Sequence, residues 1–240
     1  MLSAIVDLPI MTIAGMPGND INPTPELIPR LMVIISELPW VKIIGQIWVF
    51  GHKLLRGLSS EGMYEVLDFV SELELKDRHG REAIFKKQEK VRYLQDNIIA
   101  FQDQGWGDGR IFMNYRCTPG TPVDRYRSGY KTHILISLRE VKNKGDVDEF
   151  NIEWGIKQGF LLKTGFWATE ISHKARRFTV KVIFPKTRPP IWVSILERNR
   201  QRTHILEENA KSRLPDGRWL ITWENRQPRR YEHYILNWEW

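Results

Sequence analysis

The sequence predicts a mainly β protein, α+β overall: an antiparallel immunoglobulin-like β-sandwich with a preceding hairpin and an N-terminal helical or extended apolar arm. Apolar and polar residues alternate with a period of two after residue 61, and strand-like runs alternate with turn clusters after residue 110. The chain also holds ten tryptophans in 240 residues, and aromatic residues favour sheets. We therefore expect an arm over 1–60, a hairpin and connecting segment over 61–109, and the sandwich over 110–240.

The arm begins with 25 residues rich in proline and glycine, which argue against regular structure. Helical spacing of apolar residues follows over 25–38 and 41–55, with Pro39 between the two helices. These helices are the predicted contact for a protein partner or for self-association, through Leu31, Ile35, Trp40, Ile44 and Trp48. A membrane surface is the alternative partner, although the arm has no run of about 20 uninterrupted apolar residues.

The hairpin is predicted from two runs with a period of two, 67–75 and 81–91, joined by the turn sequence of Asp77–Gly80. The next segment, 95–104, is compatible with a strand or a short helix. Strands of the sandwich are then expected at 110–116, 130–140, 149–156, 166–172, 177–184, 191–197, 218–224 and 231–239. A short helix is an alternative for 202–212.

Two stripes of apolar residues identify the core of the sandwich. The C-terminal strand places Tyr234, Leu236, Trp238 and Trp240 on one face, and Trp219, Ile221 and Trp223 form a matching stripe. Cross-strand aromatic pairing in the core explains both stripes, with a sugar-stacking platform or a protein interface as the alternative. Apolar residues on both faces of 132–138 predict a central strand.

Few residues indicate catalysis. Cys117 is the only cysteine, which excludes an internal disulfide and favours a reducing, cytoplasmic location. No two of the six histidines lie within four residues, and no phosphate-binding glycine motif is present. The glycine-rich segment 103–109 contains Asp103 and Asp108, which are weak candidates for a divalent cation or an acid–base pair. A tight turn with Trp106 in the core is the simpler interpretation, so we expect no cofactor and no enzymatic activity.

Positive charge is concentrated in two segments. Residues 1–60 have no net charge, so the net charge of +7 belongs to 61–240. Within 171–202 there are nine cations and one acid. The residues predicted to bind nucleic acid or another anion are Lys174, Arg176, Arg177, Lys186, Arg188, Arg198, Arg200 and Arg202, together with Arg110, Arg116, Arg125 and Arg127 from the second segment. A solvated surface that pairs with acids elsewhere is the alternative.

These patterns favour a non-enzymatic binding or adaptor protein that docks to a protein partner, or to itself, through the apolar arm. A nucleic-acid-binding protein using the basic surfaces of 171–202 and 110–131 is the first alternative. A hydrolase or metal-dependent enzyme at the Asp103/Asp108 loop is the second. The sequence does not identify the partner, and it indicates no small-molecule ligand.

Overall fold

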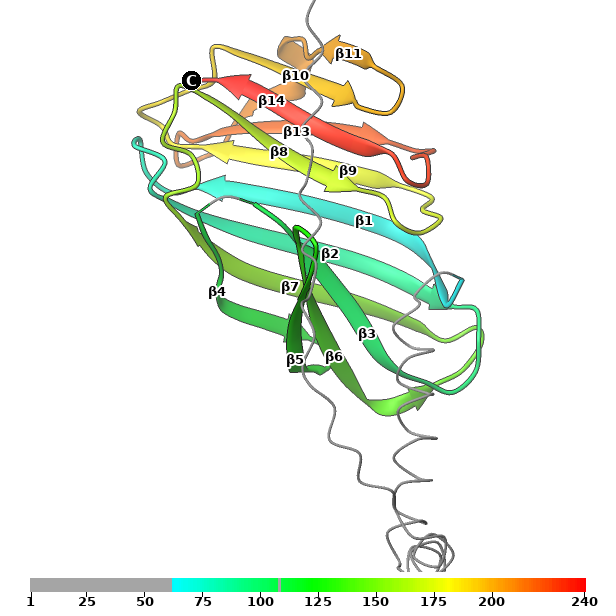
Figure 1. Cartoon of the computed structure of the whole chain (residues 1–240). Coiled ribbons are helices and arrows are strands. Elements are labelled where there is room, and N and C mark those ends of the chain that lie inside the picture. The colour runs from blue at the N-terminus through cyan, green and yellow to red at the C-terminus, as the bar shows by residue number, and fades with distance from the viewer. Residues whose placement is uncertain (1–61, 108) are drawn as a thin grey trace, which may run out of the picture. The chain divides into compact units, whose positions relative to one another are not determined.

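Fourteen strands and one short 3-10 helix make up the part of the chain that the computed structural model describes, residues 62–107 and 109–240 (Figure 1). The strands are β1 (Tyr64–Leu75), β2 (Glu82–Tyr93), β3 (Ile98–Gly105), β4 (Arg110–Thr118), β5 (Thr121–Ser128), β6 (Lys131–Lys142), β7 (Val147–Lys157), β8 (Thr164–Glu170), β9 (Phe178–Phe184), β10 (Trp192–Glu197), β11 (Arg202–Ile205), β12 (Lys211–Arg213), β13 (Trp219–Asn225) and β14 (His233–Glu239). The helix, η1, spans Glu208–Ala210.

The strands form three sheets. The largest has seven strands in the order β12-β13-β9-β1-β2-β7-β4, and the others have the orders β11-β10-β14-β8 and β3-β6-β5. All pairs of described strands are antiparallel except β1 with β9. The prediction of a mainly β, antiparallel sandwich is therefore confirmed for the described residues, and the predicted hairpin β1–β2 lies in the middle of the largest sheet.

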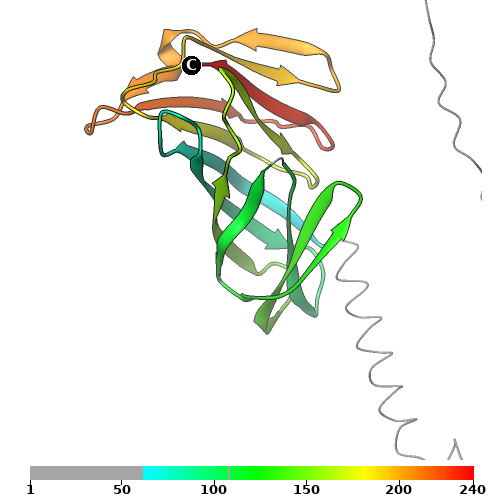
Figure 2. The same ribbon diagram turned by 60° about the vertical axis from the view of Figure 1, so that its left-hand side comes forward.

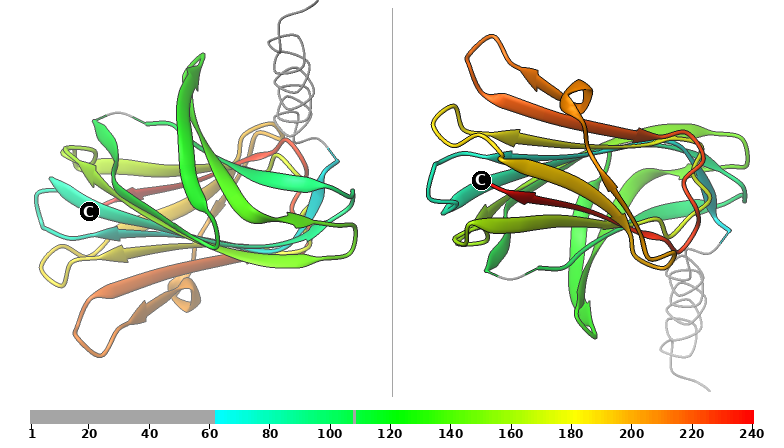
Figure 3. Two further views of the ribbon diagram at one scale, coloured as in Figure 1. Left: turned by 90° about the horizontal axis from the view of Figure 1, so that it is seen from below. Right: turned by 90° about the horizontal axis from the view of Figure 1, so that it is seen from above.

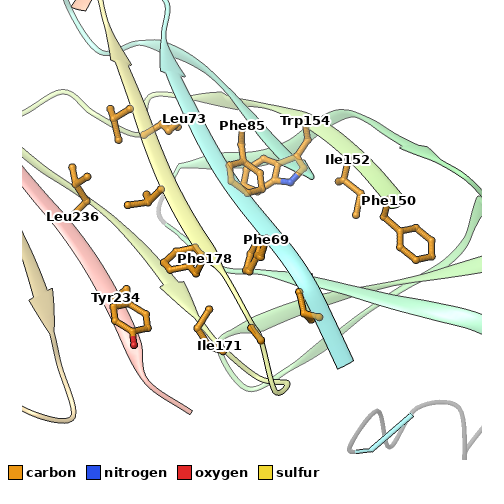
Figure 4. Packing of buried hydrophobic residues seen from close by; sticks show 14 of the residues in the cluster. Phe69, Leu73, Phe85, Phe150, Ile152, Trp154, Ile171, Phe178, Tyr234 and Leu236 are labelled. Atoms are coloured by element: carbon orange, nitrogen blue, oxygen red, sulfur yellow. The ribbon is translucent and has the colours of Figure 1, made fainter. Parts of the chain in front are cut away.

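The two smaller sheets cover the same face of the seven-stranded sheet. Phe69 of β1 is adjacent to Phe178 of β9 and to Glu89 of β2, and Glu89 is adjacent to Phe150 of β7, so these side chains form one row across that face. At one end of the row the Tyr234 ring of β14 lies 5.5 Å from Phe178 (Figure 4). At the other end Phe101 of β3 stacks on Phe150 at 3.9 Å. Figure 3 shows these layers from two sides.

The predicted aromatic stripes do lie in the core. Trp238 and Leu236 are fully buried, as is Ile221. The contact between the stripes is not cross-strand, however, because β13 and β14 belong to different sheets. Trp223 instead packs across the sandwich on Tyr234, with ring centres 5.3 Å apart.

Some segments differ from the sequence-based prediction. The segment 95–104 contains a strand, β3, and the helix considered for 202–212 is replaced by β11, η1 and β12. The strand β5 was not predicted, and Figure 2 shows it in a hairpin with β6 that stands away from the large sheet. The segment 132–138 belongs to β6, which is central in its sheet, as predicted. The helices expected over 25–55 lie outside the described residues.

Among the residues that the structure describes, no helix is long and apolar enough to span a membrane.

Candidate binding groove

Two hollows open where the smaller sheets approach each other over the large sheet. The outer one is a groove of about 620 Å³, and the inner one is a cavity of about 100 Å³. Trp106, Trp167 and Ala168 line both hollows. These three residues therefore form the wall between the groove and the cavity.

The groove runs beside β8. Its walls come from β8 itself, from the preceding loop with Phe160, Leu161 and Leu162, and from the hairpin of β5 and β6. Trp106 lies in the loop after β3, and its ring meets the edge of Tyr130 at 6.1 Å between ring centres. Aromatic and aliphatic side chains thus contribute to the groove from segments far apart in the sequence.

Several large apolar side chains around the groove are exposed. Leu162 is 73 % exposed, Phe166 59 %, Leu161 56 % and Tyr130 61 %. Single exposed apolar residues are ordinary on a protein surface, but a contiguous group indicates an interaction site. The groove is therefore the strongest candidate for a binding surface within the described residues.

Positive charges lie at the groove. Arg127 and Arg198 both line it, and neither has an acidic partner among the described residues. Lys131, by contrast, has an acidic partner: its ammonium group pairs with the carboxylate of Glu170 at the end of β8. The Nε2 atom of His233 lies 3.7 Å from the same carboxylate.

The inner cavity contains a buried group of charges. The odd-numbered residues of β2 face the core, and this register places Lys87 and Glu89 among Phe85 and Val91. The Nζ atom of Lys87 lies 2.6 Å from Oε2 of Glu89 and 3.1 Å from Oδ1 of Asp103 on β3.

Tyr115 completes this group by donating a hydrogen bond of 2.9 Å to the other oxygen of Asp103. Burial alone lowers the pKa of Lys87, but the two carboxylates outweigh it and raise the pKa above its ordinary value. Burial and the nearby Asp103 raise the pKa of Tyr115. The Lys87 ammonium and the Tyr115 hydroxyl therefore both keep their protons at neutral pH.

Asp103, the one candidate metal residue that the structure describes, is not part of a metal site among the described residues. Asp103 is 1 % exposed and is engaged by Lys87 and Tyr115. Asp108 lies outside the described residues, and no cluster of three potential metal ligands is present among those described. Trp106, expected as a core residue, instead lies in the wall between the groove and the cavity.

The basic residues of 171–202 do not gather on one surface. Arg176 and Arg177 precede β9, whereas Lys186 and Arg188 follow it, and a seven-residue strand separates such positions by roughly 20 Å. Three of the arginines pair with acids: Arg176 with Glu65, Arg177 with Asp68, and Arg200 with Glu197. Arg188 donates to a backbone carbonyl and lies 3.9 Å above the Trp240 ring. Lys174 and Arg202 are exposed.

The second basic segment divides between two sheets. Arg110 and Arg116 belong to β4, and Arg125 and Arg127 to β5. The Arg125 guanidinium lies 5.0 Å from the Phe112 ring. The two basic segments meet at the groove, where Arg127 comes from one and Arg198 from the other.

Sequence reasoning missed most of the groove. The arm residues predicted to contact a partner, Leu31, Ile35, Trp40, Ile44 and Trp48, lie outside the described residues. The adjacent Leu161 and Leu162, in a loop after Gly159, were a local signal, because two large aliphatic residues in a turn are rarely both buried.

Comparisons with known proteins give only distant likenesses in shape. No protein-family model matches the sequence, and no curated protein matches it. Similar solved structures include an M1 zinc metallopeptidase from Deinococcus radiodurans, with 11 % identity and a TM-score of 0.46 over 73 % of this chain and 42 % of that one. Another is a putative protease from Parabacteroides distasonis, with 6 % identity and a TM-score of 0.47 over 75 % of this chain and 41 % of that one. The chain spans less than half the length of these proteins.

Proposed function

We propose that this protein is a non-enzymatic binding protein that docks a protein partner in the groove beside β8. The observation that supports the proposal is a groove of about 620 Å³ bordered by the exposed side chains of Leu161, Leu162 and Phe166. Full burial of one such side chain contributes about 1.5–3 kcal/mol. Two or three of them supply about 3–9 kcal/mol, against an association cost of about 4–15 kcal/mol, so other contacts of the partner with the groove must contribute as well.

The test uses the full chain and a displayed library of random peptides of about 12 residues, long enough to span β8 at about 3.3 Å per residue. The dissociation constant of each selected peptide is then measured by fluorescence anisotropy. Phe166→Ala and Leu162→Ala should each weaken binding by about tenfold, which corresponds to 1.4 kcal/mol of lost burial.

The matched controls are Val123→Ala and Val141→Ala. Both valines are also exposed, at 57 % and 52 %, but neither lines the groove. They should leave the affinity unchanged. Selected peptides that bind equally well to the groove variants would place the binding surface elsewhere and contradict the proposal, as would a library that yields no binder.

A single-stranded nucleic acid is the second candidate partner. Arg127 and Arg198 line a groove that also contains Tyr130 and Trp106, and such a combination could hold phosphates and stack bases. Anisotropy titrations with single-stranded DNA and RNA at two salt concentrations test this candidate. Binding should weaken steeply with salt and be lost in an Arg127→Glu/Arg198→Glu variant. An absence of binding at low salt would exclude it.

A further inference from the structure

The edge of β8 that faces away from β14 offers unpaired backbone groups. In an antiparallel pair, residues that exchange backbone hydrogen bonds alternate with residues that do not. The amide of Trp240 donates to the Lys163 carbonyl at 3.0 Å, and the amide of Ile171 donates to the Glu232 carbonyl at 3.0 Å. The register between these two bonds has no shift. Odd-numbered residues of β8 therefore bond to β14, and the N–H and C=O groups of Phe166 and Ala168 point outward.

The groove follows this edge. It is lined by five consecutive residues of β8, Thr164 to Ala168. A groove on a sheet face would be lined by alternate residues only, because successive side chains point to opposite faces. Among the described strands, β8 has β14 as its one neighbour in the sheet. The outward backbone groups of Phe166 and Ala168 are thus accessible from the groove.

We infer that the partner binds as an extended segment that adds a strand to the free edge of β8, with a large apolar side chain in the groove and an acidic side chain near Arg127 and Arg198. This inference rests on the proposed function, because it specifies what the same groove takes up. Main-chain hydrogen bonds would provide affinity, and alternate side chains would provide selectivity.

The charge of the groove favours an acidic segment. Arg127 belongs to β5 and Arg198 lies in the turn after β10, and both line one groove without acidic partners among the described residues. No carboxylate lines the groove among the described residues, and Glu170, which follows Ala168 on β8 and lines the smaller cavity, is already engaged by Lys131 and His233. An arginine beside an apolar surface forms its best contacts with planar anions, which in a peptide are carboxylates.

A single strand fits the groove better than a second copy of the domain. Trp106 and Tyr130 line the same groove as the β8 edge, so a partner at that edge shares the groove with these two rings. One extended chain occupies less of the groove than a whole sheet does. The proposed occupant is therefore a peptide segment, and self-association through β8 is an outcome that the experiment can reveal.

The first experiment removes one outward backbone donor. Ala168→Pro deletes the N–H that faces the groove but keeps the ladder to β14, and proline is tolerated at such positions of edge strands. Ala168→Ser is the matched control, because it retains the N–H. Selected peptides should bind the proline variant at least about tenfold more weakly, since a hydrogen bond is lost and the ring obstructs the added strand. The serine variant should bind like the wild type.

The second experiment tests the acidic side chain. A selected peptide that contains glutamate is compared with the same peptide carrying glutamine at that position. The wild-type protein should prefer the glutamate peptide by about fivefold or more, as expected for a charge-assisted hydrogen bond. Arg127→Glu and Arg198→Glu should abolish this preference. Arg202→Glu, which changes an exposed arginine of β11 outside the groove, should preserve it.

The outcomes separate this inference from the proposed function. If Phe166→Ala weakens binding and Ala168→Pro does not, the groove binds a partner, but the inference that this partner pairs with the edge of β8 is wrong. If neither substitution changes binding, both ideas are wrong. Should Ala168→Pro fail to fold, hydrogen exchange of the wild type replaces it: a bound peptide should slow exchange at Phe166 and Ala168 and not at Val123. Unchanged exchange at the first two amides, or dimers detected by sedimentation without peptide, would overturn the inference.

Discussion

Substitution of Lys87 by methionine should destabilise the protein strongly, because it leaves two buried carboxylates without their shared cation. The Lys87 side chain is 12 % exposed, and those of Glu89 and Asp103 are 5 % and 1 % exposed. Breaking a buried ion pair by removing one partner costs about 3–5 kcal/mol. For a protein of this size, 1 kcal/mol corresponds to about 2–4 °C in melting temperature, so a decrease of roughly 6–20 °C is expected.

Asp103→Asn provides the contrast. With Lys87, Glu89 and Asp103 all ionised, the group carries one net negative charge, and the asparagine variant leaves a neutral pair. The asparagine oxygen can also still accept the hydrogen bond from Tyr115. This substitution should therefore cost about 1.5–3 kcal/mol, the value of one hydrogen bond to a charged group. Equal effects of the two substitutions would show that net charge is not what determines stability here.

The measurement is urea unfolding of the full chain, followed by tryptophan fluorescence, at pH 7 and at pH values up to 12. The pKa of Lys87 is raised in the folded protein above its ordinary value of 10.5. The contribution of the charged Lys87 side chain to the free energy of unfolding is therefore complete below about pH 10.5 and is lost as the pH rises further. The cost of Lys87→Met should decrease above that pH, by at most about 1.4 kcal/mol per pH unit. A cost below 1 kcal/mol at pH 7, or one that increases with pH, would refute the reasoning.

Two further predictions concern Cys117 and Gly165. Burial, reinforced by Asp103, raises the pKa of the Cys117 thiol to about 12. At pH 8 this thiol should therefore react with a disulfide reagent about a hundredfold more slowly in the native protein than in the urea-unfolded protein. Equal reaction rates in the two states would contradict this prediction. A Cβ atom at Gly165 would lie 2.6 Å from the Trp238 ring, so Gly165→Ala should cost about 1–3 kcal/mol in unfolding free energy. Gly155→Ala is the control, because its Cβ meets only ordinary contacts at 3.5 Å.

Strands with one buried face could be predicted from the sequence, because alternation of apolar residues directly reflects burial. The predicted 177–184 and 231–239 correspond to β9 and β14 within two residues. The strand β5 could not be found this way, since nearly all its residues are exposed and its backbone pairs with β6 alone among the described strands.

The candidate site was less predictable than the fold. Trp106, Phe166 and Arg198 have no common pattern in the sequence, and only the meeting of two sheets brings them to one groove. The buried charge group did leave a local signal: Lys87 occupies the same register as Phe85 and Val91, which face the core. A charged residue on an apolar face predicts burial with a partner, but not that the partner comes from β3.

The parallel pairing of β1 with β9 has a consequence for synthesis on the ribosome. β1 pairs with β2 along one edge and with β9 along the other. β1 ends at Leu75 and β9 ends at Phe184, so about 110 further residues must be translated before β9 can cover its edge of β1. At 5–20 residues per second this interval lasts roughly 5–20 s. During that time a nascent chain presents an open strand edge next to Phe69 and Leu73, and chaperones that shield such edges should associate with it preferentially over this interval.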